Sequence, residues 1–197
     1  MRTSRLEAFS DGVLAIIITI MVLELKIPHG EEFGDLGDSL PSLLTYLLSF
    51  IYIGIYWNNH HHLFQLVDRV DGVVLWANLH LLFWLSLVPF TTAWMDETSM
   101  ATAPTVIYGI NLLAAAVAYY ALQLVIRRID DAGHLSLALG DDLKGKLSPV
   151  LYVLGIVGAL LAPVVGIVFF VAVALIWIVP DRRLEEYVGS RQDSAAG

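Results

Sequence analysis

Long apolar segments dominate this sequence, and they constrain its fold more than any other feature. A helix needs about 20 apolar residues to cross the roughly 30 Å of hydrocarbon in a membrane. Of the 197 residues, 57% are hydrophobic and only 15% are charged, a balance that is rare in soluble domains. The sequence therefore predicts an all-α integral membrane protein with a single domain over residues 1–197. We expect six transmembrane helices, at about residues 4–26, 40–67, 72–94, 103–128, 147–161 and 163–179.

Prolines set several of these expected boundaries. Ser39-Leu40-Pro41 predicts the start of the second helix, with the serine as N-cap and the proline in the first turn. Pro89 is expected to bend the third helix near its end. Residues 147–179 form an apolar run that is too long for one crossing, so we divide it at Pro163. The remaining polar segments are expected to form an interfacial turn at residues 135–139 and a disordered tail at residues 188–197.

The basic residues predict the orientation in the membrane. If the N-terminus is cytoplasmic, Lys26 is the only one of the 11 Lys and Arg residues in an outer segment. Cytoplasmic loops carry an excess of Lys and Arg, so this bias favours six spans with both termini in the cytoplasm. The outer loops are acidic, which indicates either a solvated surface or one that concentrates cations at an outer mouth. The acidic residues are Glu24, Glu31, Glu32, Asp35, Asp38, Asp96 and Glu97.

Composition also excludes several classes of function. A formal net charge of −8 argues against a nucleic-acid partner. The absence of cysteine excludes disulfides, thiolate metal sites and cysteine nucleophiles. The sequence has no Gly-x-Ser-x-Gly or Walker motif, so we expect no enzyme, no cofactor and no metal site. Asp11 at the start of the first apolar run, with no cleavage site after Leu23, argues against a signal peptide.

The first helix carries a regular aliphatic face. Ile16, Thr19, Ile20 and Leu23 follow the i, i+3, i+4, i+7 spacing of residues on one side of a helix. Such a face is compatible with ordinary helix packing or lipid contact. It is also compatible with several copies of the helix around an axis, where a ring of branched aliphatic side chains can gate ions by dewetting.

Ionisable and polar residues lie close to this face. Arg5 and Asp11 are about 240° apart around a helix, so they cannot easily pair, and each requires a partner elsewhere. Arg5 is long enough to extend to the membrane interface. Asp11 is expected to lie deeper, and an ionisable group inside a membrane usually marks a functional region. Residues 57–62, Trp-Asn-Asn-His-His-His, form the densest polar cluster of the chain. They indicate interhelical hydrogen bonding more than a metal site, and we expect His60 to face Asp11.

Arg5-x-x-x-Phe9-Ser10-Asp11, followed by apolar residues 12–25, resembles the first helix of the transmembrane protein 175 family. These proteins are the endosomal and lysosomal potassium channels of animals and their prokaryotic homologues. Residues 57–64 and 78–90 are similar to the second and third helices of the family. The motif resemblance covers about the first 95 residues, and the six-helix layout extends it to the whole chain.

The resemblance implies a homotetramer in the lipid bilayer of a prokaryotic plasma membrane, with the first helices around a central pore. It implies that Ile16, Ile20 and Leu23 form a hydrophobic constriction and that Thr19 supplies a hydroxyl layer linked to potassium preference. An apolar ring must distort the hydration shell of an ion without replacing it, so we expect K+, Rb+ and Cs+ to pass more easily than Na+, with moderate selectivity. The resemblance also implies a structural polar network of Arg5, Phe9, Ser10, Asp11, Trp57, Asn58, His60, His61 and Asn78.

Two other functions stay open from the sequence. The first is a proton-coupled secondary transporter that uses Asp11 and the membrane histidines as a relay. The second is a membrane enzyme or metal protein built on His60, His61 and His80. Coupled, saturable uptake would favour the transporter, and stoichiometric metal would favour the metal protein.

Overall fold

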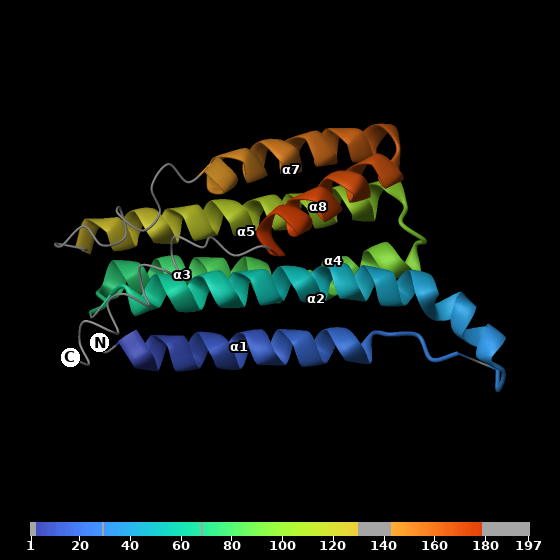
Figure 1. Ribbon diagram of the computed structural model, residues 1–197, viewed down its shortest axis with the longest axis horizontal. Helices are drawn as coiled ribbons and strands as arrows, with labels where there is room; N and C mark the ends of the chain where they lie inside the picture. The colour runs from blue at the N-terminus through green and yellow to red at the C-terminus, as the bar shows by residue number, and fades with distance from the viewer. Residues whose placement is uncertain (1–2, 29, 68, 130–142, 179–197) are drawn as a thin grey trace.

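The computed structural model describes residues 3–28, 30–67, 69–129 and 143–178 and shows a bundle of helices along one long axis (Figure 1). The predicted interfacial turn at residues 135–139 and the predicted tail at residues 188–197 lie outside the described residues. The helices are α1 (Thr3–Leu23), α2 (Leu36–Gln65), α3 (Gly72–Ser86), α4 (Val88–Glu97), α5 (Thr102–Ile129), α7 (Leu143–Leu161) and α8 (Pro163–Ile178), with a 3-10 turn η1 (Phe33–Asp35) before α2.

The bundle places α1 and the last two helices on opposite sides. α1 packs against α2, α3 and α4, whereas α7 and α8 pack against α5 and α8 also reaches α2 (Figure 1). α1 therefore has one side against the bundle and another side that no described part of the chain covers. This arrangement leaves the first helix available for contacts outside the protomer.

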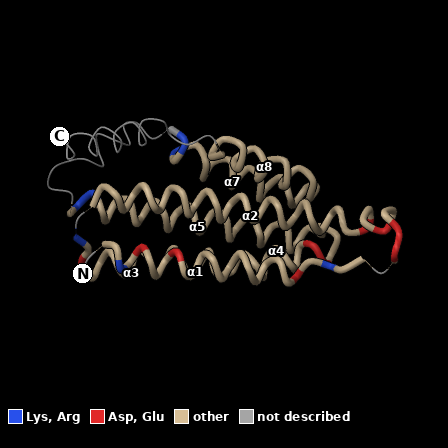
Figure 2. Tube along the Cα trace, turned by 60° about the horizontal axis from the view of Figure 1, so that its bottom comes forward, with Lys and Arg blue, Asp and Glu red and all other residues tan. Residues whose placement is uncertain are grey.

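Five described helical units are long and apolar enough to cross a membrane. They comprise α1, α2 with η1, the α3–α4 pair, α5 and α7, while α8 has 16 residues and a length of about 24 Å. Between the two ends of the bundle the helices carry few charges (Figure 2). The structure thus shows an all-helical, multi-pass membrane protein, and the count of six crossings stays a prediction.

The start of α2 differs from the prediction made from Ser39 and Pro41. The helix begins at Leu36, so Pro41 lies inside it and Ser39 is not the N-cap. The reason is η1, where Glu32 and Asp35 form a capping box and the Asp35 carboxylate accepts the Glu32 backbone N–H at 2.8 Å. This turn leads directly into α2, so the helix has already begun when the chain reaches the proline.

The third predicted helix consists of two helices instead of one bent helix. α3 ends at Ser86, Leu87 has φ −86° and ψ −9°, and α4 begins at Val88. Pro89 is therefore in the first turn of α4, where its missing N–H costs no helical hydrogen bond. The proline breaks the span two residues before its own position.

Small residues bring α7 and α8 close together. A Cβ added at Gly166 would lie 2.6 Å from the Ala159 Cβ and 2.9 Å from the Gly155 carbonyl oxygen. A backbone neighbour cannot rotate away as a side chain can. The helix contact therefore requires glycine at this position.

We expect Gly166→Ala to destabilise the bundle by about 1–3 kcal/mol, because the added methyl group overpacks this contact. Gly54 in α2 is the matched control, since nothing lies within 4 Å of its would-be Cβ. Gly54→Ala should be neutral or stabilising by up to about 1 kcal/mol. Reversible unfolding in mixed micelles measures both changes, and equal stability of the two variants would contradict the packing argument.

Candidate pore face and its polar support

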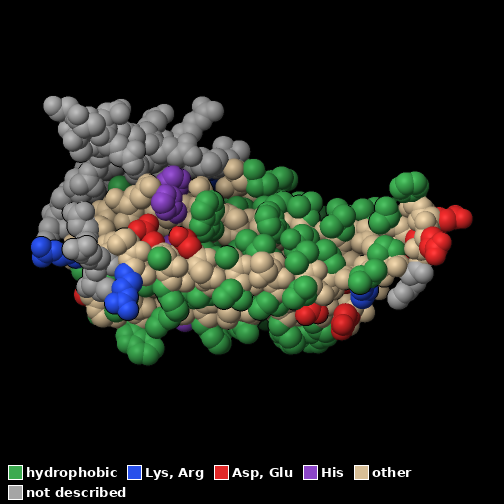
Figure 3. Space-filling model, turned by 90° about the horizontal axis from the view of Figure 1, so that it is seen from below, with side chains coloured by type: hydrophobic (Ala, Val, Ile, Leu, Met, Phe, Trp, Pro, Cys, Tyr) green, Lys and Arg blue, Asp and Glu red, His purple; other side chains and the backbone are tan. Residues whose placement is uncertain are grey.

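The side chains of α1 divide into a buried face and an exposed face. Ile17 is 3% exposed, whereas Ile16 is 59% and Leu23 is 80% exposed. The exposed residues Ile16, Thr19, Ile20 and Leu23, called the α1 stripe below, follow one side of the helix. Figure 3 views the bundle from the α1 side and shows hydrophobic side chains over the middle of this face, with charged groups towards its ends.

Thr19 is the hydroxyl within the α1 stripe. Its Oγ1 donates a hydrogen bond to the Ile16 carbonyl oxygen at 2.9 Å, within the same helix. This bond uses the hydroxyl proton and leaves the lone pairs of the oxygen free to bind a donor or a cation from outside the protomer. The residue can thus present an oxygen ligand without an unsatisfied donor.

An apolar groove runs beside the α1 stripe. It has a volume of about 560 Å³, and Ile16 and Ile20 contribute to both the groove and the stripe. A large exposed apolar surface marks contact with a membrane or with another protein. The groove is lined by Val13, Ile16, Ile17, Ile20, Glu24, Ser86, Pro89, Phe90 and Ala93, from α1, α3, α4 and the segment that follows α1.

A buried polar chain ties the other side of α1 to α2 and α3. The Asn78 amide donates to Ser10 Oγ at 3.0 Å, and His60 Nε2 lies 2.8 Å from Asn78 Oδ1. Because the Asn78 oxygen accepts, His60 carries its proton on Nε2. Ser10 and Asn78 are fully buried and His60 is 2% exposed, so these bonds form away from water.

A second, more exposed polar cluster links α1 with α2. Trp57 Nε1 donates to Asp11 Oδ1 at 3.1 Å, and His61 Nδ1 lies 3.6 Å from Glu7 Oε1. The Gln65 amide lies 2.8 Å from His61 Nε2. Figure 3 shows histidine and acidic side chains gathered near one end of this face. The cluster and the buried polar chain hold α1 from two sides, just before the α1 stripe begins.

The structure brings together six of the nine residues predicted for the polar network. Ser10, His60 and Asn78 belong to the buried polar chain, and Asp11, Trp57 and His61 belong to the exposed cluster. The other three do not join them: Arg5 and Phe9 are exposed, Asn58 is half-buried, and none of these side chains forms a hydrogen bond within the described part of the chain.

His60 lies close enough to Asp11 to interact with it electrostatically, as expected, but it is not its hydrogen-bond partner, because Asp11 accepts from Trp57 and His60 bonds to Asn78. The sequence analysis also missed Glu7 and Gln65. Glu7 lies four residues before Asp11, and Gln65 lies four residues after His61, so helical spacing alone places each pair on one side. The spacing was the available signal for both residues.

The described histidines form no metal centre. Among residues 3–28, 30–67, 69–129 and 143–178, no group of three His, Cys, Asp or Glu side chains could hold a metal ion. His80 lies apart from the other two predicted ligands and accepts a hydrogen bond from Trp84 Nε1 at 3.0 Å. This geometry argues against a metal protein built on His60, His61 and His80.

Asp96, one of the acidic residues predicted to lie in an outer loop, has a local structural role. Asp96 lies 3.5 Å from Lys26 Nζ and accepts from Ser42 Oγ at 2.7 and 2.8 Å. These contacts tie the segment that follows α1 to α2 and α4. Part of the acidity predicted for the outer mouth is therefore neutralised within the protomer.

Together, these features define a class of multi-pass helical membrane proteins in which polar contacts fix the first helix and leave its aliphatic side free. The model of the family described as "Endosomal/lysosomal potassium channel TMEM175" matches residues 5–89. A potassium channel of Chryseobacterium sp. (strain P1-3) is 53% identical over 187 residues, which cover 94% of this chain and 97% of that protein. The chain belongs to the TMEM175 family, and it is a membrane channel protein and not an enzyme.

Other relatives extend the comparison. A potassium channel of Streptomyces collinus is 35% identical over 164 residues, covering 79% of this chain and 78% of that protein. The crystal structure of a lysosomal potassium-selective channel TMEM175 homolog from Chamaesiphon minutus matches with a TM-score of 0.73 at 30% identity, over 91% of this chain and 97% of that one. The endosomal/lysosomal proton channel TMEM175 of Danio rerio is 34% identical over 118 residues, which cover 57% of this chain but 22% of that protein.

Proposed function

We propose that four copies of this chain form a potassium-preferring channel in the plasma membrane of a prokaryote, with their α1 helices around a central pore. The observation that carries the proposal is the α1 stripe, which is exposed while the opposite side of α1 is buried. Potassium channels are among the chain's relatives at 53% and 35% identity. In this arrangement the free side of α1 meets the ions.

The proposed constriction consists of Ile16, Ile20 and Leu23. Rings of branched aliphatic side chains exclude water when they are narrow, and an ion must lose or distort part of its hydration shell to pass. K+, Rb+ and Cs+ hold water less tightly than Na+ or Li+, so they lose less at such a ring. Thr19 is the one side chain of the α1 stripe that offers an oxygen, and selectivity is moderate because the remaining rings supply no ligands.

Several copies are needed because one protomer offers only one strip of pore wall. The groove beside α1, with its volume of about 560 Å³, provides an apolar surface next to this strip. An α1 helix from a neighbouring copy, or the side of its bundle, would cover that surface. This geometry supports an assembly with the α1 helices at its centre, and four is the number that the family resemblance implies.

Exchange of Thr19 for cysteine tests the proposed pore, and the chain has no native cysteine to interfere. We expect a positively charged methanethiosulfonate reagent to reduce K+ flux through Thr19→Cys in liposomes by at least about tenfold, because the product places a fixed charge in the ion path. Val168→Cys is the matched control, since Val168 is 61% exposed on α8, away from α1. Equal sensitivity of the two variants would contradict the assignment of α1 to the pore.

The proposed layout has six crossings with both termini in the cytoplasm. α8, at about 24 Å, spans the hydrocarbon only with local thinning of the bilayer, which costs fractions of a kcal/mol per ångström. A membrane-impermeant maleimide applied to intact cells should label Phe33→Cys, which replaces a side chain that is 95% exposed in η1, before α2. Arg128→Cys, in the last turn of α5, should react only after permeabilisation. The reverse pattern would overturn the orientation.

Proton transport is the rival function, since the Danio rerio relative is described as a proton channel. The contacts do not favour a coupled relay, because Asp11 bonds to Trp57 and the described residues show no hydrogen bond from Asp11 to a histidine. Measurement of K+ and H+ flux in the same liposomes separates the cases. Saturable K+ uptake that requires a proton gradient would show that the protein is a transporter and not a channel.

A further inference from the structure

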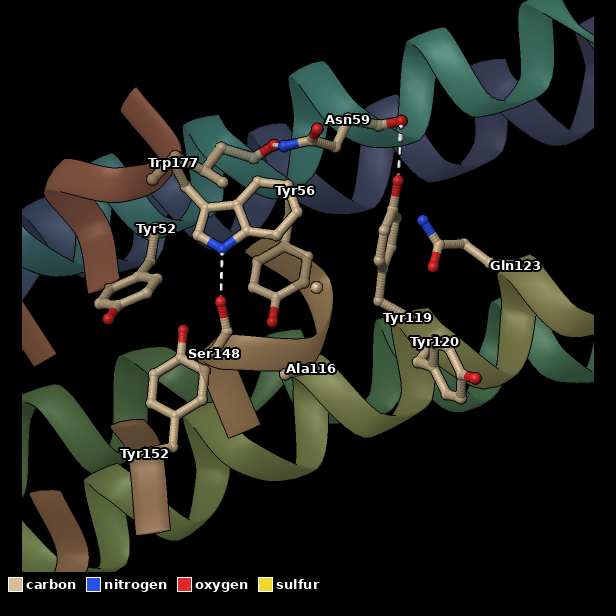
Figure 4. Close-up of a pocket in the computed structure, with 12 residues that line it drawn as sticks. Tyr52, Tyr56, Asn59, Ala116, Tyr119, Tyr120, Gln123, Ser148, Tyr152 and Trp177 are labelled. Carbon is tan, nitrogen blue, oxygen red and sulfur yellow. Dashed lines mark hydrogen bonds between the residues drawn. The ribbon is translucent and has the colours of Figure 1, made fainter. Parts of the chain in front are cut away.

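An aromatic cavity lies on the far side of the protomer from α1. Its described lining comes from α2, α5, α7 and α8 and includes no residue of α1 (Figure 4). Aromatic rings dominate the wall, and each of the four helices contributes at least one of them. They belong to Tyr52, Tyr56, Tyr119, Tyr120, Tyr152 and Trp177.

The rings are fixed by contacts among the residues that line the cavity. Tyr56 and Tyr119 meet edge to face, with centroids 6.0 Å apart and planes at 71°, so their surfaces form a corner. Tyr119 Oη donates to the Asn59 carbonyl oxygen at 3.1 Å, and Trp177 Nε1 donates to Ser148 Oγ at 2.7 Å (Figure 4). Preorganised rings lose little conformational entropy when a ligand binds.

The chemistry of the wall selects the ligand. None of the described lining residues is charged, so the cavity offers no partner for an anion and no carboxylate for a strongly hydrated metal ion. The faces of phenol and indole rings are negative and attract cations. A quaternary ammonium ion fits these conditions, because its charge is diffuse, it is weakly hydrated and it has no N–H group to satisfy.

The size of the cavity is compatible with this group. The volume open to the centre of a water-sized sphere is about 40 Å³, which is several times the volume that the centre of one water requires. A compact space of that extent holds a group of roughly 3.5 Å radius, about the size of a trimethylammonium group. Gln123 adds an amide to the wall that can bond to a hydroxyl or ester substituent of the ligand.

We infer that this aromatic cavity binds a quaternary ammonium group of the choline type, either as the free ion or as the headgroup of a lipid. The site is separate from the proposed pore, and its occupation can be measured without any ion flux. Binding data therefore test it whether or not the proposed channel function holds.

Calorimetric titration of the purified full-length protein in dodecyl maltoside with choline tests the inference. We expect saturable binding, and we expect 3,3-dimethylbutan-1-ol, the uncharged isostere of choline, to bind at least about tenfold more weakly, since the ring faces attract charge and not shape alone. Equal affinity for the two molecules would overturn the cation site. So would the absence of heat up to about 10 mM choline and up to the same concentration of the phosphatidylcholine used below.

Variants at Trp177 locate the ion. Trp177→Phe and Trp177→Leu both remove the hydrogen bond to Ser148, but only phenylalanine keeps an aromatic face. We expect Trp177→Phe to retain choline affinity within about threefold and Trp177→Leu to lose at least about tenfold. Tyr120→Leu, at a ring that is 50% exposed, provides a second lining variant if Trp177→Leu does not fold.

Trp76→Leu is the matched control, because Trp76 is 75% exposed on α3 and does not line the cavity. Unchanged affinity in both lining variants, or loss in Trp76→Leu alone, would place the ion elsewhere and overturn the site.

Dihexanoyl phosphatidylcholine below its micellar concentration, compared with the phosphatidylglycerol analogue, identifies the source of the quaternary ammonium group. Binding of choline alone supports the free ion, and binding of phosphatidylcholine without choline supports the lipid headgroup.

Discussion

Ile16→Asn is expected to raise ion flux through the reconstituted protein at least about tenfold and to reduce its preference for K+ over Na+. Ile16 is 59% exposed on the free side of α1, at the level where the α1 stripe begins. A carboxamide in each copy would let water wet the proposed constriction, and a barrier lower by about 1.4 kcal/mol corresponds to a tenfold increase. Selectivity falls because ions would then keep more of their hydration shells.

Fluxes of K+, Na+ and Cs+ into proteoliposomes measure this effect, normalised to the amount of assembled protein. Ile16→Val keeps a branched aliphatic ring and should change flux by less than about threefold. Val168→Asn adds the same amide to an exposed position of α8 and controls for general damage by a polar group in the membrane. If Ile16→Asn conducts and selects as the unaltered protein does, Ile16 does not line the pore.

The proposed constriction shows what the spacing of apolar residues can predict and what it cannot. Spacing alone placed Ile16, Thr19, Ile20 and Leu23 on one side of α1, and the structure shows that this side is exposed. Spacing could not show whether the side faces lipid, a second copy or an ion path, because all three environments accept aliphatic side chains. That distinction depends on contacts between chains, which a protomer does not contain.

The ends of the helices are harder to predict from the sequence than their approximate positions. Hydropathy reports where a chain can be buried in lipid, so it placed the long helices within a few residues. The start of α2 instead depends on a capping box made by Glu32 and Asp35 in a polar turn. The division between α3 and α4 depends on where the backbone turns ahead of Pro89, which hydropathy does not record.

Pairing between helices was the hardest feature to predict. The sequence predicts Asp11, Trp57, His60 and Asn78 as polar-network residues, but it does not show that Asp11 hydrogen-bonds to Trp57 and His60 to Asn78. A partner is decided by the rotation of one helix against another, and a change of one residue in register exchanges one partner for the next. The aromatic cavity also depends on how helices are rotated against one another, since its rings come from four helices that are distant in sequence.

Asn78→Leu is expected to destabilise the folded protein by about 2–3 kcal/mol. Asn78 is fully buried, accepts from His60 and donates to Ser10, so it joins three helices. Leucine is of similar size but leaves the His60 Nε2–H without an acceptor, and a buried unsatisfied donor costs about 1–3 kcal/mol. Ser10 suffers less, because its hydroxyl still donates to the Leu6 carbonyl oxygen at 3.0 Å.

Reversible unfolding in mixed dodecyl maltoside and dodecyl sulfate micelles measures this change, with Asn58→Leu as the matched control. Asn58 is half-buried on α2, and its side chain forms no hydrogen bond within the described residues, so its replacement should cost less than about 0.5 kcal/mol. The double variant His60→Phe with Asn78→Leu separates hydrogen bonding from packing. If the loss comes from the unsatisfied imidazole, removal of both polar partners recovers most of it, because two apolar groups in contact leave nothing to satisfy. If the two losses simply add, shape at the α1–α2–α3 contact holds the first helix in place, and the buried polar chain is not what stabilises it.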